Sequence, residues 1–324
     1  MTAMTSPQGF SLLADIGGTN TRVALARGPK VLPDSIRRFK NADHKGLEPI
    51  LTRYLAEQDH PVCTGVAVDL AGPVRNGVGT LTNLDWVIDA PSLTRASGAQ
   101  QVAILNDMQA QGHAIGNIEA ANLKPVLTTA TTEDTGTKLV INVGTGFNAA
   151  PVYDTPQGRS VAASECGHAN MPIRSESELR LMKFVETAHG FPAIEDVLSG
   201  RGLERVYAWI GHEENDPKDK PAAEIVASCL AQDDPRAEAA GRRFTRLLGT
   251  VSGNLSLIHL PFGGVYLVGG VACAFLPLLE DYGFGQTFRD KGRFGEFMEN
   301  FSVTLVTDDY AALAGLARHL AETR

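Results

Sequence analysis

Three glycine turns each follow a short apolar run, and they are the first residues in this chain whose types could do chemistry. The three turns are Gly17-Gly18-Thr19-Asn20, Gly144-Thr145-Gly146 and Gly269-Gly270. Successive backbone N–H groups in a tight glycine turn form a concavity that binds anions such as phosphate. One such turn is typical of an ordinary hairpin, but three at the ends of apolar runs favour a phosphate site.

Two common kinds of nucleotide site do not fit these turns. The lysine-containing loop pattern G-x-x-x-x-G-K-[ST] does not occur in the sequence. The run GTGFNA, residues 144–149, fits the dinucleotide pattern G-x-G-x-x-A, with Glu165 about twenty residues further on. That pattern needs a helix after the glycines, and Pro151 with the turn DTPQG prevents a helix here. We therefore expect ATP rather than NAD.

The first turn contains no lysine, so another cation must offset the charge of a bound phosphate. Mg²⁺ that arrives with the nucleotide can supply that charge. Asp15 ends the apolar run before the turn and could orient the ion through water, because Mg²⁺ keeps several of its waters. The sequence thus predicts ATP and Mg²⁺ as cofactors, held by two facing hairpin turns and Asp15.

Polar side chains elsewhere could bind or activate a second substrate. Asn106 and Asp107 lie between an apolar run and a helical stretch, so they either cap the helix or place a carboxylate base at a cleft. Glu165 and His168 lie three apart among small residues, either as surface loop residues or as two ligands of one polyhydroxyl molecule. A zinc site would need further ligands nearby, which the sequence lacks. Glu195 reads as an exposed helix residue.

Hydrophobic periodicity predicts the elements that must position these residues. In the first half we expect strands at 11–16, 21–26, 31–39 and 100–107, a strand that runs into a Gly-Pro turn over 62–74, and helices at 45–58, 92–98 and 108–118. In the second half we expect strand, turn, strand, turn and strand over 138–164, a surface loop at 211–224, and helices at 235–260 and 308–322. Asp15-Ile16-Gly17 and Asn142-Val143-Gly144 then occupy equivalent places, which indicates a weak internal repeat of one hairpin unit.

Composition excludes several classes of protein. The chain has 324 residues, 43% of them hydrophobic and 20% charged, and its formal net charge is −8, which argues against nucleic acid or an anionic membrane as partner. Its most apolar stretch, Val265–Leu279, is shorter than the roughly 20 residues of a membrane helix, and a buried strand, glycine turn and helix fit it better. The four scattered cysteines favour a reducing cytosol, and the first ten residues do not resemble a signal peptide.

Taken in order, these motifs resemble the bacterial ATP-dependent glucokinase family, within the actin–hexokinase–heat-shock ATPase superfamily. The matching segments span most of the chain and are ADIGGTNTRVAL, AGPV, LTNLDW, LNDMQA, GTG, the E-x-G-H of residues 165–168, EDVLSGRGL and LVGGV. The resemblance implies a two-lobed α/β protein with the actin-like ATPase (ribonuclease H-like) fold, each lobe being a mixed five-stranded sheet flanked by helices. The small lobe would comprise residues 10–117 and 308–324, and the large lobe residues 118–307.

The resemblance also implies what the candidate residues do. The first two glycine turns would grip the ATP phosphates, and Gly269-Gly270 would lie near the adenosine. Asn106, Asp107, Glu165, His168 and Glu195 match the sugar-binding residues of the family. The aspartate among them would be the general base. A cytoplasmic enzyme of glycolysis and a homodimer are further expectations from the family.

The chain departs from the family pattern at two motifs. Val143, Phe147 and Asn148 replace the proline, the leucine and the last glycine of P-G-T-G-L-G. Asparagine tolerates left-handed backbone better than most residues, so we expect the turn to survive. Cys166 occupies the second position of E-G-G-H, where a small residue fits.

We therefore expect transfer of the γ-phosphoryl group of MgATP to the 6-hydroxyl of glucose. One alternative is a kinase for another hexose or an N-acetylhexosamine. Another, prompted by the altered second turn, is a sugar-sensing protein with weakened catalysis.

Overall fold

The computed structural model describes residues 9–81, 84–129 and 136–323. Residues 1–8 of the N-terminal segment and Thr82-Asn83 of the LTNLDW motif lie outside the described residues. The contacts divide the chain into two compact units. Unit 1 comprises Met1–Ile118, Thr155–Ala163 and Asp308–Arg324, and unit 2 comprises Glu119–Asp154 and Ser164–Thr307. These ranges differ from the expected lobes mainly at Thr155–Ala163, and the boundaries of the functional lobes stay a prediction.

Unit 1 is built on a mixed sheet in the strand order β3-β2-β1-β5-β9, with β4 also paired to β2. The strands are β1 (Phe10–Ile16), β2 (Asn20–Arg27), β3 (Lys30–Val31), β4 (Arg37–Lys40), β5 (Cys63–Leu70) and β9 (Gln101–Asn106). β1 is antiparallel to β2 and parallel to β5, and β5 is parallel to β9. The carboxyl ends of β1, β5 and β9 therefore lie along one edge of the sheet, which is where α/β proteins commonly place their sites.

The single strand expected over residues 31–39 is wrong. A 3₁₀ turn at Pro33–Ser35 separates β3 from β4. Pro33 has no N–H to give to a strand ladder. The Ser35 hydroxyl instead accepts the N–H of Leu25 on β2 at 2.9 Å, so the interruption leaves that backbone donor satisfied.

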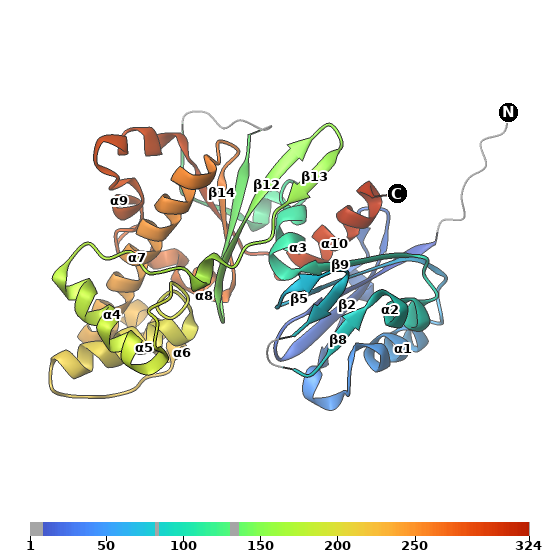
Figure 1. The fold of residues 1–324 in the computed structure, drawn as a ribbon, viewed down its shortest axis with the longest axis horizontal. Helices are drawn as coiled ribbons and strands as arrows, with labels where there is room; N and C mark the ends of the chain where they lie inside the picture. Colours follow the sequence, from blue (N-terminus) through green and yellow to red (C-terminus); the bar gives the residue numbers. More distant parts are fainter. Residues whose placement is uncertain (1–8, 82–83, 130–135, 324) are drawn as a thin grey trace. The chain divides into compact units, whose positions relative to one another are not determined.

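Two helical layers cover the sheet of unit 1 (Figure 1). The helices are α1 (Leu47–Glu57), α2 (Ala90–Ser97), α3 (Asp107–Ala114) and α10 (Ala311–Glu322). Successive residues of a strand point to opposite faces, so Leu12 and Ala14 pack with α1 and α2 while Leu13 packs with α3 and α10. A small antiparallel sheet consists of β6 (Val74–Arg75), β7 (Val78–Thr80) and β8 (Val87–Asp89), and a 3₁₀ turn lies at Asn41–Asp43.

A second mixed sheet has the order β10-β15-β14-β11-β12-β13; its strands lie in unit 2 except β13 and the last residue of β12, which group with unit 1. Its strands are β10 (Leu123–Leu127), β11 (Lys138–Val143), β12 (Phe147–Thr155), β13 (Gly158–Val161), β14 (Val265–Val268) and β15 (Val303–Val306). Each of the two large sheets has six strands where the resemblance implied five. In unit 1 the sixth arises because β3 and β4 share the edge of β2, and in unit 2 β10 pairs antiparallel to β15.

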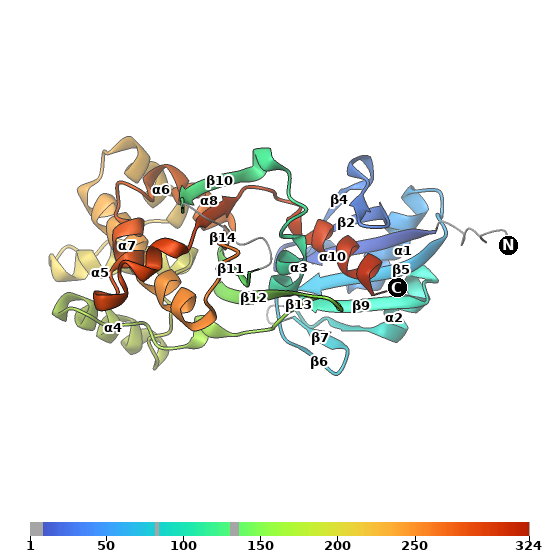
Figure 2. The same ribbon diagram turned by 90° about the horizontal axis from the view of Figure 1, so that it is seen from above.

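Helices α4 to α7 gather on one side of the sheet of unit 2 (Figure 2). The helices are α4 (Glu176–His189), α5 (Gly200–Glu213), α6 (Ala222–Ala231), α7 (Pro235–His259), α8 (Gly270–Phe275) and α9 (Phe284–Arg289), and 3₁₀ turns lie at Ala120–Asn122, Cys166–His168, Leu276–Leu278, Gly292–Phe294 and Phe297–Asn300. α7 begins after Asp234, whose carboxylate accepts the N–H groups of Arg236 and Ala237. The apolar side chains at helical spacing along α7 are buried (Phe244, Leu247, Leu248, Val251 and Leu255), whereas Ile258 in the last turn is 69% exposed.

Two further predictions are confirmed in unit 2. The apolar stretch Val265–Leu279 forms β14, a glycine turn and α8, and within the described ranges no helix is long and apolar enough to cross a membrane. The hairpin repeat also exists. Asp15 pairs with Arg22 across β1–β2, and Asn142 pairs with Asn148 across β11–β12, so the second turn is one residue shorter than the first.

Candidate active site

The first glycine turn joins β1 to β2 at the carboxyl end of β1. The N–H of Gly17 donates to the carbonyl of Asn20 at 3.0 Å and closes the turn. Buried Asn41 braces it from behind, since its side-chain amide donates to the Gly17 carbonyl at 2.7 Å and its backbone N–H donates to the Thr19 carbonyl at 2.9 Å. Gly18 and Thr19 are exposed at the tip, where an anion could reach their N–H groups.

Asp15 forms an ion pair with Arg22, its cross-strand partner, at 2.8 Å. The first turn lacks a lysine, but this arginine places a cation beside it. Sequence reasoning missed Arg22, although the expected hairpin register would have put it directly opposite Asp15. The guanidinium donates to one oxygen of the Asp15 carboxylate.

A fully buried carboxyl group, Asp69, lies between the two candidate acidic residues of unit 1. Asp69 on β5 is the register partner of Asp15, and neither of its side-chain oxygens accepts a hydrogen bond from the described residues. Burial, followed by repulsion from Asp15 and Asp107, raises the pKa of Asp69 well above its ordinary value. The carboxyl ends of the three parallel strands thus gather Asp15, Asp69 and Asp107.

Asn106 and Asp107 form the start of α3. The Asn106 side chain accepts the N–H of Met108 at 2.9 Å and donates to the Gly72 carbonyl at 3.1 Å. Asp107 also accepts the N–H of Met108, at 2.9 Å, and is partly exposed. The capping interpretation is therefore right for Asn106. It does not exclude a catalytic role for Asp107, because a carboxylate in the first turn of a helix is stabilised there as an anion.

The second glycine turn, in unit 2, is held by residues far along the chain. The N–H of Gly144 donates to the Gly146 carbonyl, and the N–H of Gly200 donates to the Gly144 carbonyl, both at 2.9 Å. Glu195 accepts the N–H of Phe147 at 3.0 Å. A Cβ on Gly146 would overlap the Glu195 carboxylate, so a larger residue here would force that side chain or the turn to shift. Thr145 is exposed at the tip.

The departures from the family pattern at this turn have structural explanations. Val143 and Phe147 are core residues, almost completely buried. The turn survives the substitution as expected, but it does not use the tolerance of asparagine for left-handed backbone, because Asn148 lies within β12 opposite Asn142. Its side chain donates to the Ser164 carbonyl at 2.6 Å, so the asparagine fastens the segment that precedes Glu165.

The E-x-G-H segment packs directly on the second turn. Residues 166–168 form a 3₁₀ turn, and a Cβ on Gly167 would overlap the Phe147 carbonyl. Glu165 and His168 are exposed. Contrary to the sequence-based expectation, Glu195 lies in a turn and not in a helix. Its backbone N–H donates to the Gly167 carbonyl at 2.8 Å. Unit 2 thereby brings these candidates together around the GTG turn.

The third turn lies beside the second. Gly269 has φ +101°, and a Cβ there would overlap the Asn142 side chain and the Val143 carbonyl, so glycine is required where β14 passes into α8. Strand β12, rather than a helix, follows the GTG turn, as expected from Pro151. No three His, Cys, Asp or Glu side chains converge into a metal site in the part of the chain that the structure describes.

Comparison with known proteins defines the class first. The solved structure of a glucokinase from an Antarctic psychrotroph superposes with a TM-score of 0.86 at 27% identity, covering 96% of this chain and 98% of that one. A Balamuthia mandrillaris glucokinase solved with glucose superposes with a TM-score of 0.79 at 21% identity, covering 98% and 95%. The fold is the actin-like ATPase fold of sugar kinases.

The sequence comparisons then give the family. The family model Glucokinase matches residues 12–323. The chain is 30% identical to the glucokinase of Erwinia tasmaniensis over 97% of its length and 98% of that protein, and 31% identical to the glucokinase of Cupriavidus pinatubonensis over 96% and 92%. The chain therefore belongs to the glucokinase family, and it is an ATP-dependent hexose kinase.

Proposed function

We propose that Asp107 is the general base in a transfer of the γ-phosphoryl group of ATP to the 6-hydroxyl of glucose. The observation that carries this proposal is the position of Asp107, partly exposed at the first residue of α3, at the edge of the sheet that also carries Asp15 and the first glycine turn. As the sugar oxygen bonds to the γ-phosphorus, its proton passes to Asp107 and the bond from phosphorus to the ADP oxygen breaks.

The two hairpin turns are the proposed binding sites for the ATP phosphates. Exposed Thr19 and Thr145 present hydroxyl and N–H donors at the tips, and Gly269-Gly270 would take the adenosine side. Asp15 at the carboxyl end of β1 is the residue that would contact, through water, a Mg²⁺ ion that arrives on the nucleotide. Such an ion would neutralise charge on the β- and γ-phosphate oxygens.

The sugar would be held by residues of both units. Asn106 contributes from unit 1, and Glu165, His168 and Glu195 contribute from unit 2. The Balamuthia glucokinase was solved with glucose, and a ROK family glucokinase from Streptomyces griseus was solved with glucose and AMPPNP. These ligands support the proposal for this chain. The cytoplasmic location and the homodimer stay predictions.

A coupled assay of ADP release with a panel of hexoses and N-acetylhexosamines tests the substrate. Glucose should give the highest kcat/KM. A higher kcat/KM for another sugar would make that sugar the substrate in place of glucose. Calorimetry separately tests the cofactor, since MgATP should bind and NAD should not. Binding of glucose without release of ADP would favour a sugar-sensing protein instead.

A further inference from the structure

We propose that Gln109 and Arg159 are positioning residues for the phosphoryl transfer, because they fasten both ends of α3 to strand β13. The inference rests on the proposed role of Asp107, which is the first residue of α3. Its physical basis is a set of hydrogen bonds that lies entirely within unit 1, since residues 155–163 pack with that unit.

At the start of the helix, one side-chain amide joins three parts of the chain. The Gln109 oxygen accepts the N–H of Asn106 at 3.1 Å, and the Gln109 nitrogen donates to the Val161 carbonyl of β13, also at 3.1 Å. Gln109 lies two residues after Asp107 on the first turn. The backbone that carries Asp107 is therefore tied to β13 through a single amide whose two ends are both used.

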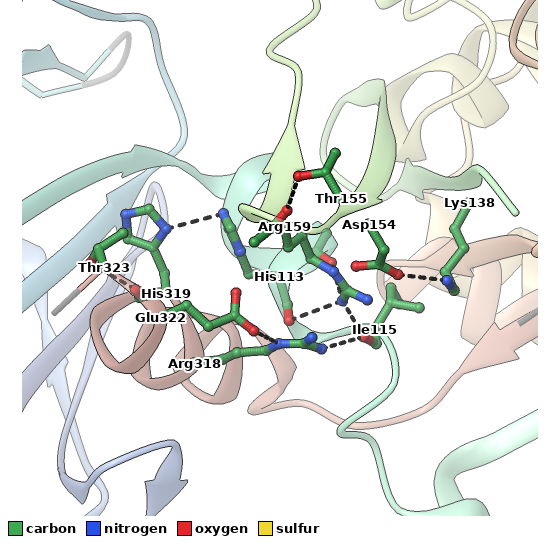
Figure 3. A network of polar contacts seen from close by, with 12 residues as sticks. His113, Ile115, Lys138, Asp154, Thr155, Arg159, Arg318, His319, Glu322 and Thr323 are labelled. Carbon is green, nitrogen blue, oxygen red and sulfur yellow. Dashed lines mark hydrogen bonds and ion pairs between the residues drawn. The ribbon is translucent and has the colours of Figure 1, made fainter. Parts of the chain in front are cut away.

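At the end of the helix, arginines replace a glycine cap. The last carbonyls of a helix lack partners within the helix, and Ile115, which follows α3, has the extended angles φ −56° and ψ 130°. The Arg159 guanidinium of β13 donates to the carbonyls of Gly112 at 3.2 Å, His113 at 3.4 Å and Ile115 (Figure 3). A fixed positive charge is also favourable beside the negative end of a helix.

Helix α10 supports the same corner. Arg318 donates to the Ile115 carbonyl at 3.1 Å and is held in turn by Glu322 at 2.6 Å (Figure 3). A Cβ on Gly315 would overlap the Ala110 carbonyl, so α10 packs tightly along α3. Helix α3 is therefore held by α10 as well as by its bonds to β13.

Strand β13 leads directly into the proposed sugar ligands. Glu165 lies four residues after Val161 in the sequence, beyond the point where the chain passes into unit 2 at Ser164. The same strand is thus tied to the helix of the proposed base and continues into the segment of Glu165 and His168. Fastening of this kind would keep the base in register with the sugar, and a misplacement of about 1 Å is enough to lower a rate roughly a hundredfold.

Two conservative variants test the fastening. Gln109→Glu keeps an oxygen that can accept the Asn106 N–H but loses the N–H donor to the Val161 carbonyl. The variant therefore removes the bond to β13 and leaves the cap of α3 in place. Arg159→Lys keeps the charge, but its ammonium lies one bond short of the guanidinium nitrogen that contacts all three carbonyls. Gln101→Glu is the matched control, because Gln101 makes the same kind of amide-to-carbonyl bond, to Leu320 at 2.9 Å, away from α3.

For both test variants we expect kcat to fall at least about tenfold and KM for MgATP to change less than about twofold, with the control near wild type. Hydrogen exchange of the α3 amides, measured without turnover, should be faster in both. Unchanged exchange, or unchanged kcat in variants with faster exchange, would overturn the positioning role. The base assignment is tested separately by Asp107→Asn, so the two ideas can fail independently.

Discussion

The Glu195 carboxylate accepts the backbone N–H of Phe147 at 3.0 Å, immediately after the GTG turn. A proposed sugar ligand is therefore also a structural support of a proposed phosphate-binding turn. The binding of glucose and the binding of MgATP should be coupled through this bond, because a change at Glu195 alters the turn as well as the contact with the sugar.

Glu195→Gln should weaken the binding of both substrates. The amide keeps the shape but loses the charge that strengthens the bond to Phe147, and charged hydrogen bonds are worth about 1.5–3 kcal/mol. We expect KM for glucose to rise about tenfold or more and KM for MgATP to rise a few-fold. Steady-state kinetics with each substrate varied in turn would check this. A rise in the KM for glucose alone would show that the bond between Glu195 and Phe147 does not couple the binding of the two substrates.

Gly146→Ala should impair the nucleotide site selectively. The added Cβ would overlap the Glu195 carboxylate, so the turn or Glu195 must shift. We expect KM for MgATP to rise at least about tenfold while the variant still folds. Gly46→Ala is the control, because nothing lies within 4 Å of a Cβ there and its φ of 169° is extended backbone. Equal kinetics for the two variants would show that the shift forced by a Cβ at position 146 does not reach the nucleotide site.

Lys291 should make stability depend on pH. Burial lowers the pKa of Lys291 to about 8 from the ordinary 10.5, and its ammonium donates to the Thr250 carbonyl at 2.9 Å. Between these two pKa values the unfolded chain binds more protons at this site than the folded chain, so the contribution of Lys291 to stability increases as pH rises. Lys291→Met removes this dependence.

Urea denaturation of both proteins at several pH values measures that effect. The free energy of unfolding of the wild type minus that of Lys291→Met should increase from about pH 7 to about pH 10. A difference that stays constant over this range would mean that the lysine titrates alike in the folded and unfolded chain.

Glucose should draw the two units together, since its proposed ligands come from both. Closure around a ligand is a common response of such sites. Small-angle scattering at saturating glucose should give a smaller radius of gyration than without sugar, and glucose with Asp107→Asn serves as a binding-competent comparison. An unchanged radius at saturation would count against a clamp formed by both units.

Local patterns predicted the strands, the long helix and the three glycine turns because each depends on neighbouring residues. Apolar spacing fixed the stripe of α7, and paired glycines after apolar runs located the turns. The break between β3 and β4 was missed although Pro33 marks it, because the run around it is otherwise typical of a strand.

Contacts between distant residues could not be predicted in the same way. Asn41 supports Gly17 across 24 positions, and Glu195 supports Phe147 across 48. Glu195 also looked like an exposed helix residue, because only the folded chain places its carboxylate on the GTG turn. Family resemblance identified Glu195, but no pattern in the sequence pointed to Asn41, Gln109 or the buried Asp69.

The central claim is that Asp107 accepts the proton of the sugar hydroxyl. Asp107→Asn keeps the size of the side chain and an oxygen for the Met108 N–H, and asparagine caps helices about as well as aspartate. General-base catalysis contributes about 10²–10⁴ in rate. With folding confirmed by a melting curve, kcat of the variant should fall at least about a hundredfold while glucose binding weakens only modestly. A folded Asp107→Asn protein that keeps most of the wild-type kcat would contradict the account and leave Asp107 as a helix residue only.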